Sequence, residues 1–383
     1  MTVVVKIGTS SLTKANGSIS ESAIDKLAKE IAIAKQDFSQ IVLVSSGAIG
    51  AGLENLGYVD NRPTDSRILQ AASAIGQPKL MATYAESFLK HDISVAQLLM
   101  APDDFFIRKR YLHARSTVEE LLTSGILPIV NENDAIADDA IRWGDNDRIA
   151  ALLAQLLNAE QLIMLTDTDG IYSQDPKRES SGTAKLIREI RSLDKIDAVV
   201  GGTSGKFGSG GMESKLAAAK MASWAGVTTT IAAATRLNVV ADSLHQVGDL
   251  GTIVRPKPNP LPARKLWIAF AVQTKGQLVI DRGAQEAIER NGGSLLAVGV
   301  LEQHGTFDSG DAVEILSEDS ELVARGLVSC SSSQLKDSLG ENVEEVEGMT
   351  PNEVIHRDEL VILSDKHYCC LLYTSDAADD TLC

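Results

Sequence analysis

The sequence has few of the residues on which secreted and membrane proteins depend. Only four of its 383 residues are cysteines, so we expect no disulfide framework. The spacing of these cysteines does not fit a zinc site either. No apolar run approaches the roughly 20 residues that a membrane-spanning helix needs. The N-terminus lacks the basic and apolar regions of a signal peptide. These absences predict a cytoplasmic protein without a membrane partner.

Basic residues are also scarce. There are 36 Lys and Arg against 52 Asp and Glu, a net charge of −16, which argues against a general nucleic-acid-binding surface. Apolar residues make up 44% of the chain, which is ample for a core. Because the length exceeds what one hydrophobic core supports, we expect two domains.

The first strand is expected at residues 3–7, a β-branched run that contains one lysine, Lys6. A charge is costly in a buried strand unless it meets an opposite charge. Lys6 therefore either reaches the surface or points at an anion beyond the strand end. Gly8 would let the backbone approach that anion, and residues 9–11 offer N–H and hydroxyl donors. The alternative is an edge-strand lysine followed by an ordinary turn.

Apolar periodicity predicts strands that alternate with helices. A helix over 18–36 would be capped by Ser18 with Glu21, and a helix over 68–89 would be interrupted at 76–78. A further helix is expected over 111–124, with strands at 41–44, 93–99, 126–130, 161–165 and 227–234. This alternation indicates parallel βαβ units, whose ligands bind beyond the carboxyl ends of the strands.

Polar clusters follow several of these strands. The Gly/Ser stretch from Ser45 could present amides to an anion, or be only a turn. Residues 131–134 directly after a strand would suit the ammonium and carboxylate of an amino acid, or form Asx turns. Asn146 or Asp147 is also a natural helix cap. The pair Asp167 and Asp169 could hold a metal, cap a turn or line a nucleotide pocket.

The most glycine-dense stretch, residues 205–215, leads into an Ala-rich helix. Backbone amides, the helix dipole and Lys215 together predict a phosphate site, although the lysine spacing differs from that of a P-loop. A flexible linker is the alternative.

A Pro-rich stretch at 256–262 marks the clearest boundary in the chain. Beyond it, short strands are expected at 266–270, 277–280, 294–300, 312–316 and 322–329, which would form a small β barrel. Residues 364–383 match no such pattern and resemble a sequencing-adapter read-through. We treat them as a non-native tail, with a disordered native tail as the alternative.

Six long motifs occur in order: VVVKIGTSSL, VLVSSGAIGAG, PIVNENDA, WGDNDRIAALLA, MLTDTDGIY and GSGGMESKLAAAKMA. Together they resemble the glutamate 5-kinases of the amino-acid kinase family, over residues 1 to about 363. The resemblance implies an α/β fold, an amino-acid kinase αβα sandwich with a mainly parallel sheet. It places this catalytic domain in 1–255, a linker in 256–262 and a barrel-like PUA domain in 263–363.

The resemblance also implies an activity, the ATP-dependent phosphorylation of the γ-carboxylate of L-glutamate with Mg²⁺. The product, L-glutamyl 5-phosphate, begins proline biosynthesis in that family. Expected partners are proline as a feedback inhibitor, a second copy in a dimer or tetramer, and a glutamyl-phosphate reductase. Residues 103–110 and 136–143 are candidates for the regulatory region.

The same resemblance assigns the site, residue by residue. The catalytic set is Lys6, Asp147 and Lys215, with Asp147 orienting the two lysines. The glutamate set is Ser46, Gly47, Asp134 and Asn146. The ATP set is Lys6, Gly8, Thr166, Asp167, Ser209, Gly210, Gly211, Met212, Glu213, Ser214 and Lys215. No residue is assigned directly to a metal. Ser209 replaces a threonine found in many members, but it keeps the hydroxyl.

The chemistry of such a reaction agrees with the residues present. A glutamate γ-carboxylate has a pKa of about 4.3, so at pH 7 it is already the nucleophile and needs no general base. None of the six histidines falls in the motifs. The task is to bring two anions together and spread their charge.

Three other functions fit parts of the sequence. Another amino-acid kinase, acting on aspartate, N-acetylglutamate or carbamate, would use the same phosphate site. The C-terminal domain alone would suggest an RNA-binding protein, against which the net charge argues. A non-catalytic amino-acid sensor is disfavoured by the intact Lys6, Asp147 and Lys215.

Overall fold

The structure is a computed structural model that describes residues 1–14, 17–37, 40–58, 62–101, 104–105, 107–136, 146–173, 184–191, 211–272, 274–340 and 353–363. The chain divides into two compact units, Met1–Leu261 and Pro262–Cys383. None of the described helices is long and apolar enough to cross a membrane.

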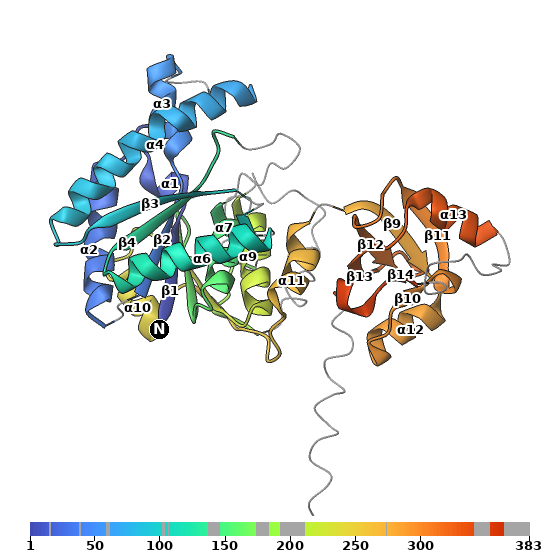
Figure 1. Cartoon of the computed structure of the whole chain (residues 1–383). Coiled ribbons are helices and arrows are strands. Elements are labelled where there is room, and N and C mark those ends of the chain that lie inside the picture. The colour runs from blue at the N-terminus through green and yellow to red at the C-terminus, as the bar shows by residue number, and fades with distance from the viewer. Residues whose placement is uncertain are drawn as a thin grey trace, which may run out of the picture. The chain divides into compact units, whose positions relative to one another are not determined.

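The N-terminal unit is built on an eight-stranded sheet with the order β3-β4-β2-β1-β5-β7-β8-β6 (Figure 1). The strands are β1 (Thr2–Ile7), β2 (Gln40–Ser45), β3 (Val95–Met100), β4 (Leu127–Glu132), β5 (Gln161–Thr166), β6 (Glu189–Ile190), β7 (Thr228–Ala233) and β8 (Thr252–Val254). All paired neighbours are parallel except β7 and β8. The mainly parallel sheet predicted from the alternation is therefore confirmed, and the carboxyl ends of β1, β2, β4 and β5 share one edge.

Helices cover both faces of this sheet (Figure 1). One face packs against α2 (Glu21–Asp37), α4 (Ser66–Leu89) and α10 (Val239–His245), and the other against α6 (Arg108–Thr123), α7 (Asn146–Leu156) and α9 (Gly211–Trp224). Short helices α1 (Thr9–Leu12), α3 (Ala48–Leu53) and η1 (Glu54–Leu56) follow the ends of β1 and β2.

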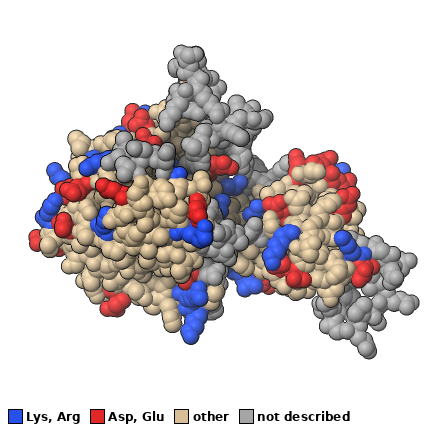
Figure 2. Space-filling view, turned by 90° about the horizontal axis from the view of Figure 1, so that it is seen from above, with Lys and Arg blue, Asp and Glu red and all other residues tan. Residues whose placement is uncertain are grey.

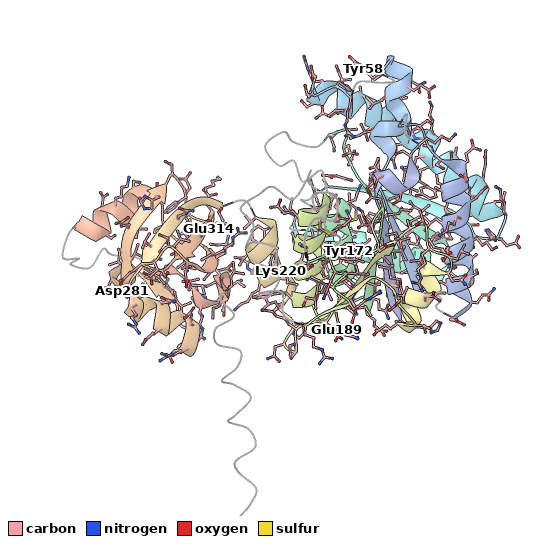
Figure 3. The ribbon with its side chains drawn as sticks, turned by 180° about the vertical axis from the view of Figure 1, so that it is seen from behind. Tyr58, Tyr172, Glu189, Lys220, Asp281 and Glu314 are labelled. Atoms are coloured by element: carbon pink, nitrogen blue, oxygen red, sulfur yellow. The ribbon has the colours of Figure 1, made fainter. Side chains whose placement is uncertain are left out.

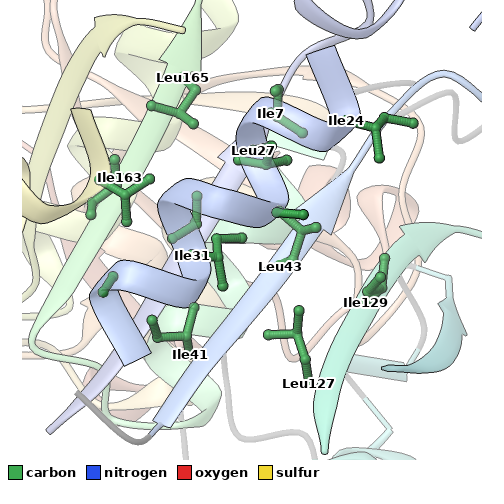
Figure 4. Close-up of a cluster of buried hydrophobic side chains, with 14 of the residues drawn as sticks. Ile7, Ile24, Leu27, Ile31, Ile41, Leu43, Leu127, Ile129, Ile163 and Leu165 are labelled. Carbon is green, nitrogen blue, oxygen red and sulfur yellow. The ribbon is translucent and has the colours of Figure 1, made fainter. Parts of the chain in front are cut away.

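The alternation of side chains along β1 decides where its lysine lies. Val3, Val5 and Ile7 belong to the core cluster beneath α2, which Figure 4 shows in close-up. Successive side chains of a strand point to opposite faces. Lys6 is therefore directed to the face covered by α7 and α9, where its ammonium group finds a carboxylate.

Three local predictions are wrong. Helix α2 begins at Glu21, and Ser20, not Ser18, accepts a hydrogen bond from the Ala23 N–H (3.4 Å). Helix α4 is continuous through 76–78 although Pro78 lies inside it, because tertiary packing outweighs the lost backbone hydrogen bond. Asn131 and Glu132 do not follow a strand but are the last two residues of β4.

Two glycines let α3 and α4 touch backbone to backbone. A Cβ atom at Gly52 would lie 1.9 Å from the Ala72 carbonyl oxygen, and one at Gly76 would lie 1.9 Å from the Ala48 carbonyl oxygen. Such distances leave no room for any side chain. The contact fixes α4 against the helix that begins directly after the Ser46-Gly47 turn.

We expect Gly76→Ala to destabilise the protein by at least about 2 kcal/mol, because the added methyl group overpacks a backbone contact. The usual effect in a helix has the opposite sign, since alanine is the better helix former. Urea unfolding followed by circular dichroism measures the change. Gly283→Ala is the control, because the nearest atom to its added methyl group is a side-chain oxygen at 3.3 Å and not a backbone atom at 1.9 Å. Equal stabilities of the two variants would contradict the packing argument.

The C-terminal unit contains a five-stranded sheet with the order β11-β9-β12-β13-β15 and a two-stranded sheet, β10-β14. Its strands are β9 (Thr274–Ile280), β10 (Leu295–Leu296), β11 (Val300–Gly305), β12 (Ala312–Leu316), β13 (Leu322–Leu327), β14 (Glu353–Ile355) and β15 (Leu360–Ile362). The helical segments are α11 (Ala263–Leu266), η3 (Trp267–Ala271), α12 (Arg282–Asn291), η4 (Ala297–Gly299), α13 (Ser332–Gly340) and η5 (Arg357–Glu359).

The sequence analysis missed the helical part of this unit. The strand expected at 266–270 is helical, and 294–300 divides among β10, a turn of 3-10 helix and the start of β11. Helix α12 was not predicted, although Asp281 is a clear start signal: its carboxylate accepts a hydrogen bond from the Ala284 N–H (2.7 Å; Asp281 is labelled in Figure 3). Ile288 then reaches the unit's core.

Candidate active site

Two lysines and one aspartate meet at the carboxyl end of β1. Lys6 extends from β1, Asp147 from the first turn of α7, and Lys215 is the fifth residue of α9. Lys6 Nζ forms an ion pair with Asp147 Oδ1, and Lys215 Nζ lies 3.2 Å from Asp147 Oδ2. Ser214 Oγ also donates to Asp147 Oδ2 (2.8 Å). The structure thus brings together the three residues predicted to be catalytic.

This cluster is buried and carries an excess positive charge. The exposed fractions of Lys6, Asp147 and Lys215 are 4%, 1% and 9%. Burial alone would raise the pKa of Asp147, but the two ammonium groups and the hydrogen bonds from Lys6 and Ser214 hold it below its usual value. Asp147 is therefore ionised and forms ion pairs with both lysines. Two ammonium groups beside one carboxylate favour an anion.

The backbone around the cluster leaves room for such an anion. A Cβ atom at Gly8 would lie 3.5 Å from Lys6 Nζ, so a side chain there would extend beside the ammonium group. Helices α7 and α9 pack together and both begin here, which adds the positive ends of two helix dipoles. These features fit a phosphate group.

A network of amide and hydroxyl groups lies next to the lysine cluster. Asn146 Nδ2 donates to Ser46 Oγ (3.0 Å) and to Asn131 Oδ1 (2.9 Å). Asn146 Oδ1 accepts from the Glu132 N–H (3.2 Å). Ser46 follows β2, and Gly47 has φ +108°, a conformation that glycine adopts without strain before α3. Because Asn146 precedes Asp147, one peptide bond connects the network to the lysine cluster.

Asp134 lies two residues beyond Glu132, the last residue of β4. Its Oδ2 accepts a hydrogen bond from Ser73 Oγ of α4 (3.2 Å). Burial raises the pKa of Asp134, and the hydrogen bond from Ser73 and the charge of Arg62 offset only part of this effect. A half-buried carboxylate in this position would gain from a cationic ligand.

Thr166 and Asp167, at the end of β5, lie in a separate pocket of about 210 Å³. Ser10 and Ser11 of α1 and the two charged residues that α2 contributes, Lys26 and Glu30, also line it. Lys6, Asp147 and Lys215 are not among the lining residues. The residues predicted for ATP therefore fall into two groups at one edge of the sheet.

Part of the predicted ATP set lies outside the described residues, namely Ser209 and Gly210. Gly211, Met212 and Glu213 form the first turn of α9, next to Ser214 and Lys215. Among the residues that the structure describes, no group of three or more His, Cys, Asp and Glu is placed to hold a metal ion. Both carboxylate oxygens of Asp147 are occupied by lysine and serine.

Comparison with known proteins identifies the class. The family model "Amino acid kinase family" matches residues 1–232, and "PUA domain" matches residues 276–349. Among solved structures, carbamate kinase from Giardia lamblia bound to AMP-PNP has a TM-score of 0.49 and 20% identity, covering 67% of this chain and 98% of its own. The chain belongs to the amino acid kinase family, as the motifs predicted, and it is a kinase with a C-terminal PUA domain.

Individual curated proteins give a more specific match than the family models do. Glutamate 5-kinase of Nocardia farcinica (strain IFM 10152) is 42% identical over 359 residues, 94% of this chain and 96% of that protein. Glutamate 5-kinase of Pseudomonas entomophila (strain L48) is 40% identical over 365 residues, 94% of this chain and 97% of that protein. The predicted resemblance to glutamate 5-kinases is confirmed.

Proposed function

We propose that this kinase transfers the γ-phosphoryl group of ATP to the γ-carboxylate of L-glutamate. One observation carries the proposal: Asn146 and Asp147 are consecutive, so a network of amide and hydroxyl groups that could bind a carboxylate directly adjoins a buried cluster of two lysines and one aspartate that could bind phosphate. That juxtaposition is what a reaction between two anions requires. The relatives named above are glutamate 5-kinases, which supports the choice of acid.

The reaction needs charge neutralisation and no proton transfer. A γ-carboxylate oxygen attacks the γ-phosphorus, the bond to the oxygen bridging the β- and γ-phosphorus atoms breaks, and that oxygen leaves with the electron pair on ADP. Lys6 and Lys215 neutralise the phosphoryl oxygens as the charge spreads. Asp147 holds both ammonium groups at their spacing, and Ser214 holds Asp147.

ATP would be held by both groups of predicted residues. Gly8 and the first turn of α9, residues 211–214, would bind the phosphates, and Thr166 and Asp167 would contact the rest of the nucleotide. Ser209 and Gly210 belong to the same proposed set. Mg²⁺ would arrive on the triphosphate, because the oxygens of Asp147 are already engaged, and would neutralise phosphate charge.

Glutamate would be bound by groups matched to its charges. The hydroxyl of Ser46, the amide of Asn146 and the backbone at Gly47 can bind a carboxylate, and Asp134 can bind the ammonium group. Both ends of the substrate are thereby oriented while its γ-carboxylate faces Lys6.

The test is an acyl-phosphate trap. The full chain is incubated with ATP, Mg²⁺, hydroxylamine and either L-glutamate, L-aspartate or N-acetyl-L-glutamate. Hydroxamate formed from glutamate alone supports the proposal. Hydroxamate from another acid would leave the phosphate site in place but overturn the substrate. If none forms, a chain ending at Leu363 is assayed in the same way, and failure there would reject the reaction.

We expect Asp134→Asn to raise KM for glutamate about tenfold or more and to leave KM for ATP within about twofold, because it removes one substrate charge partner. Lowering the pH should raise KM for glutamate in the same way as the substitution does. The pKa of Asp134 is raised, so its carboxylate protonates at a higher pH than an ordinary aspartate, and KM for glutamate in the unmodified enzyme should rise as pH falls toward 5. Steady-state kinetics from pH 8 to 5 measure both effects. A change confined to KM for ATP would show that glutamate binds elsewhere.

The wider role follows from the product. The product is a mixed anhydride that hydrolyses readily, so we propose that a glutamyl-phosphate reductase consumes it on the way to proline. We also propose that proline is a feedback inhibitor and that the enzyme works as a homo-oligomer, a dimer or a tetramer. Adding proline to the hydroxamate assay tests the inhibition. We place the catalytic domain in 1–255, the linker in 256–262, the PUA domain in 263–363 and the non-native tail in 364–383.

RNA binding by the C-terminal unit is the second candidate, and its charge argues against it. Residues 262–363 contain eight Lys and Arg against 18 Asp and Glu, a net charge of −10. Figure 2 shows acidic side chains gathered on this unit, at the right of the view. Such a surface repels a phosphate backbone.

A further inference from the structure

Helix α4 contributes a buried glutamine, Gln77, that is hydrogen-bonded to the network of the proposed glutamate site. Gln77 is 7% exposed, and its Oε1 accepts a hydrogen bond from Asn131 Nδ2 (2.9 Å). Asn131 is 1% exposed, and its Oδ1 accepts from Asn146 Nδ2 and from the Glu132 N–H. A continuous chain of side-chain hydrogen bonds therefore runs from Gln77 through Asn131 and Asn146 to Ser46.

This chain has a direction. A side-chain amide has one donor end and one acceptor end, and a buried amide adopts the orientation that its partners permit. Gln77 accepts from Asn131 Nδ2 and the Glu132 N–H donates to Asn131 Oδ1, and together these two bonds direct Asn131 Oδ1 at Asn146 Nδ2. Asn146 in turn donates to Ser46 Oγ. This bond occupies a lone pair of the Ser46 oxygen, so the serine's own proton is available for an acceptor such as a carboxylate.

The register of α4 places Gln77 at this point. Gly76, which directly precedes Gln77, packs against the Ala48 carbonyl of α3. Helix α3 begins directly after Ser46-Gly47. Both ends of the hydrogen-bonded chain are thereby attached to one rigid helix pair. Continuity of α4 through Pro78 keeps Gln77 on the same face as Ser73, which contacts Asp134.

We infer that Gln77 is a positioning residue for the acid substrate: acting through Asn131 and Asn146, it makes the Ser46 hydroxyl a hydrogen-bond donor toward the substrate carboxylate. This inference rests on the proposed function, because it takes Ser46 and Asn146 as substrate-binding groups. Gln77 itself contacts no reacting atom.

The test is Gln77→Met, which keeps the length and volume but removes the acceptor. KM for glutamate should rise about tenfold, while KM for ATP and kcat stay within about twofold. Gln77→Glu can accept the same hydrogen bond and should restore KM to within about threefold of the unmodified enzyme. Ser87→Ala is the matched control, since it removes a different buried polar group of α4, outside this series of hydrogen bonds, and should change neither KM.

A double-mutant cycle with Ser46→Ala tests whether Gln77 influences glutamate binding through Ser46. If Gln77 acts through Ser46, Gln77→Met should add less than about a twofold change in KM for glutamate when Ser46 is already alanine. Should Gln77→Met not fold, Gln77→Asn replaces it, because its side chain is one methylene too short to reach Asn131.

The outcomes separate this inference from the proposed function. An unmodified enzyme that phosphorylates glutamate, together with a Gln77 variant of unchanged KM for glutamate, would overturn the inference alone. Equal increases in both KM values, or fully additive effects in the cycle, would assign Gln77 a merely structural role and also overturn it. An unmodified enzyme that phosphorylates no glutamate would overturn the proposed function instead.

Discussion

Replacing Lys215 with alanine is expected to lower kcat by about a hundredfold or more, the cost of losing one preorganised donor to a developing charge. Lys215 is buried and its ammonium group lies 3.2 Å from Asp147, so it is held in place before the phosphate binds. KM for glutamate should change far less, because the lysine acts on the phosphoryl group. Initial rates at saturating ATP and glutamate measure the effect, and Lys6→Ala should behave in the same way.

Lys220→Ala is the control for this prediction. Lys220 lies five residues further along α9 and is labelled in Figure 3. Its removal subtracts the same charge from the same helix without touching Asp147, and kcat should stay within about twofold. A Lys215→Ala variant within a few-fold of the unmodified enzyme would show that this lysine is not catalytic.

The second large effect concerns stability. Asp147→Asn leaves two buried ammonium groups beside a neutral amide, and breaking a buried ionic contact in this way costs about 3–5 kcal/mol. Urea unfolding of the full chain at pH 7, followed by circular dichroism, measures this loss. Catalysis should fall as well, because the two lysines would move apart.

The pH dependence of this loss has a definite sign. Because the folded state lowers the pKa of Asp147, its contribution to stability is complete above the unfolded-state pKa of about 3.9 and disappears as pH falls through the lower folded-state value. The stability difference between the two proteins should be constant from pH 7 to about 4.5 and shrink only below that. Asp25→Asn, which breaks a surface pair with Lys90, is the control and should change stability far less. A difference that disappeared near pH 6 would mean that Asp147 is not held ionised by the lysines.

Much of the architecture could be predicted from local patterns. Alternating apolar periods indicate a parallel α/β sheet, because a period of two and a period of 3.6 describe strands and helices directly. The same period of two places Lys6 on the face opposite Val5 and Ile7. The order of the motifs then identifies the family, and with it the residues that the structure gathers at the carboxyl ends of the strands.

Tertiary structure alone decided which of these residues touch and what supports them. The bonds of Asp147 to Lys215 and of Asn131 to Gln77 join residues 68 and 54 positions apart, and no local pattern encodes such a distance. The sequence indicated a break at Gly76 and Pro78, where packing against α3 instead keeps α4 continuous. Local propensity is weak, and burial of a whole helix face outweighs it. The motifs therefore determined which groups can perform the chemistry, whereas their spacing, protonation and support depend on helices that contact them only in the folded chain.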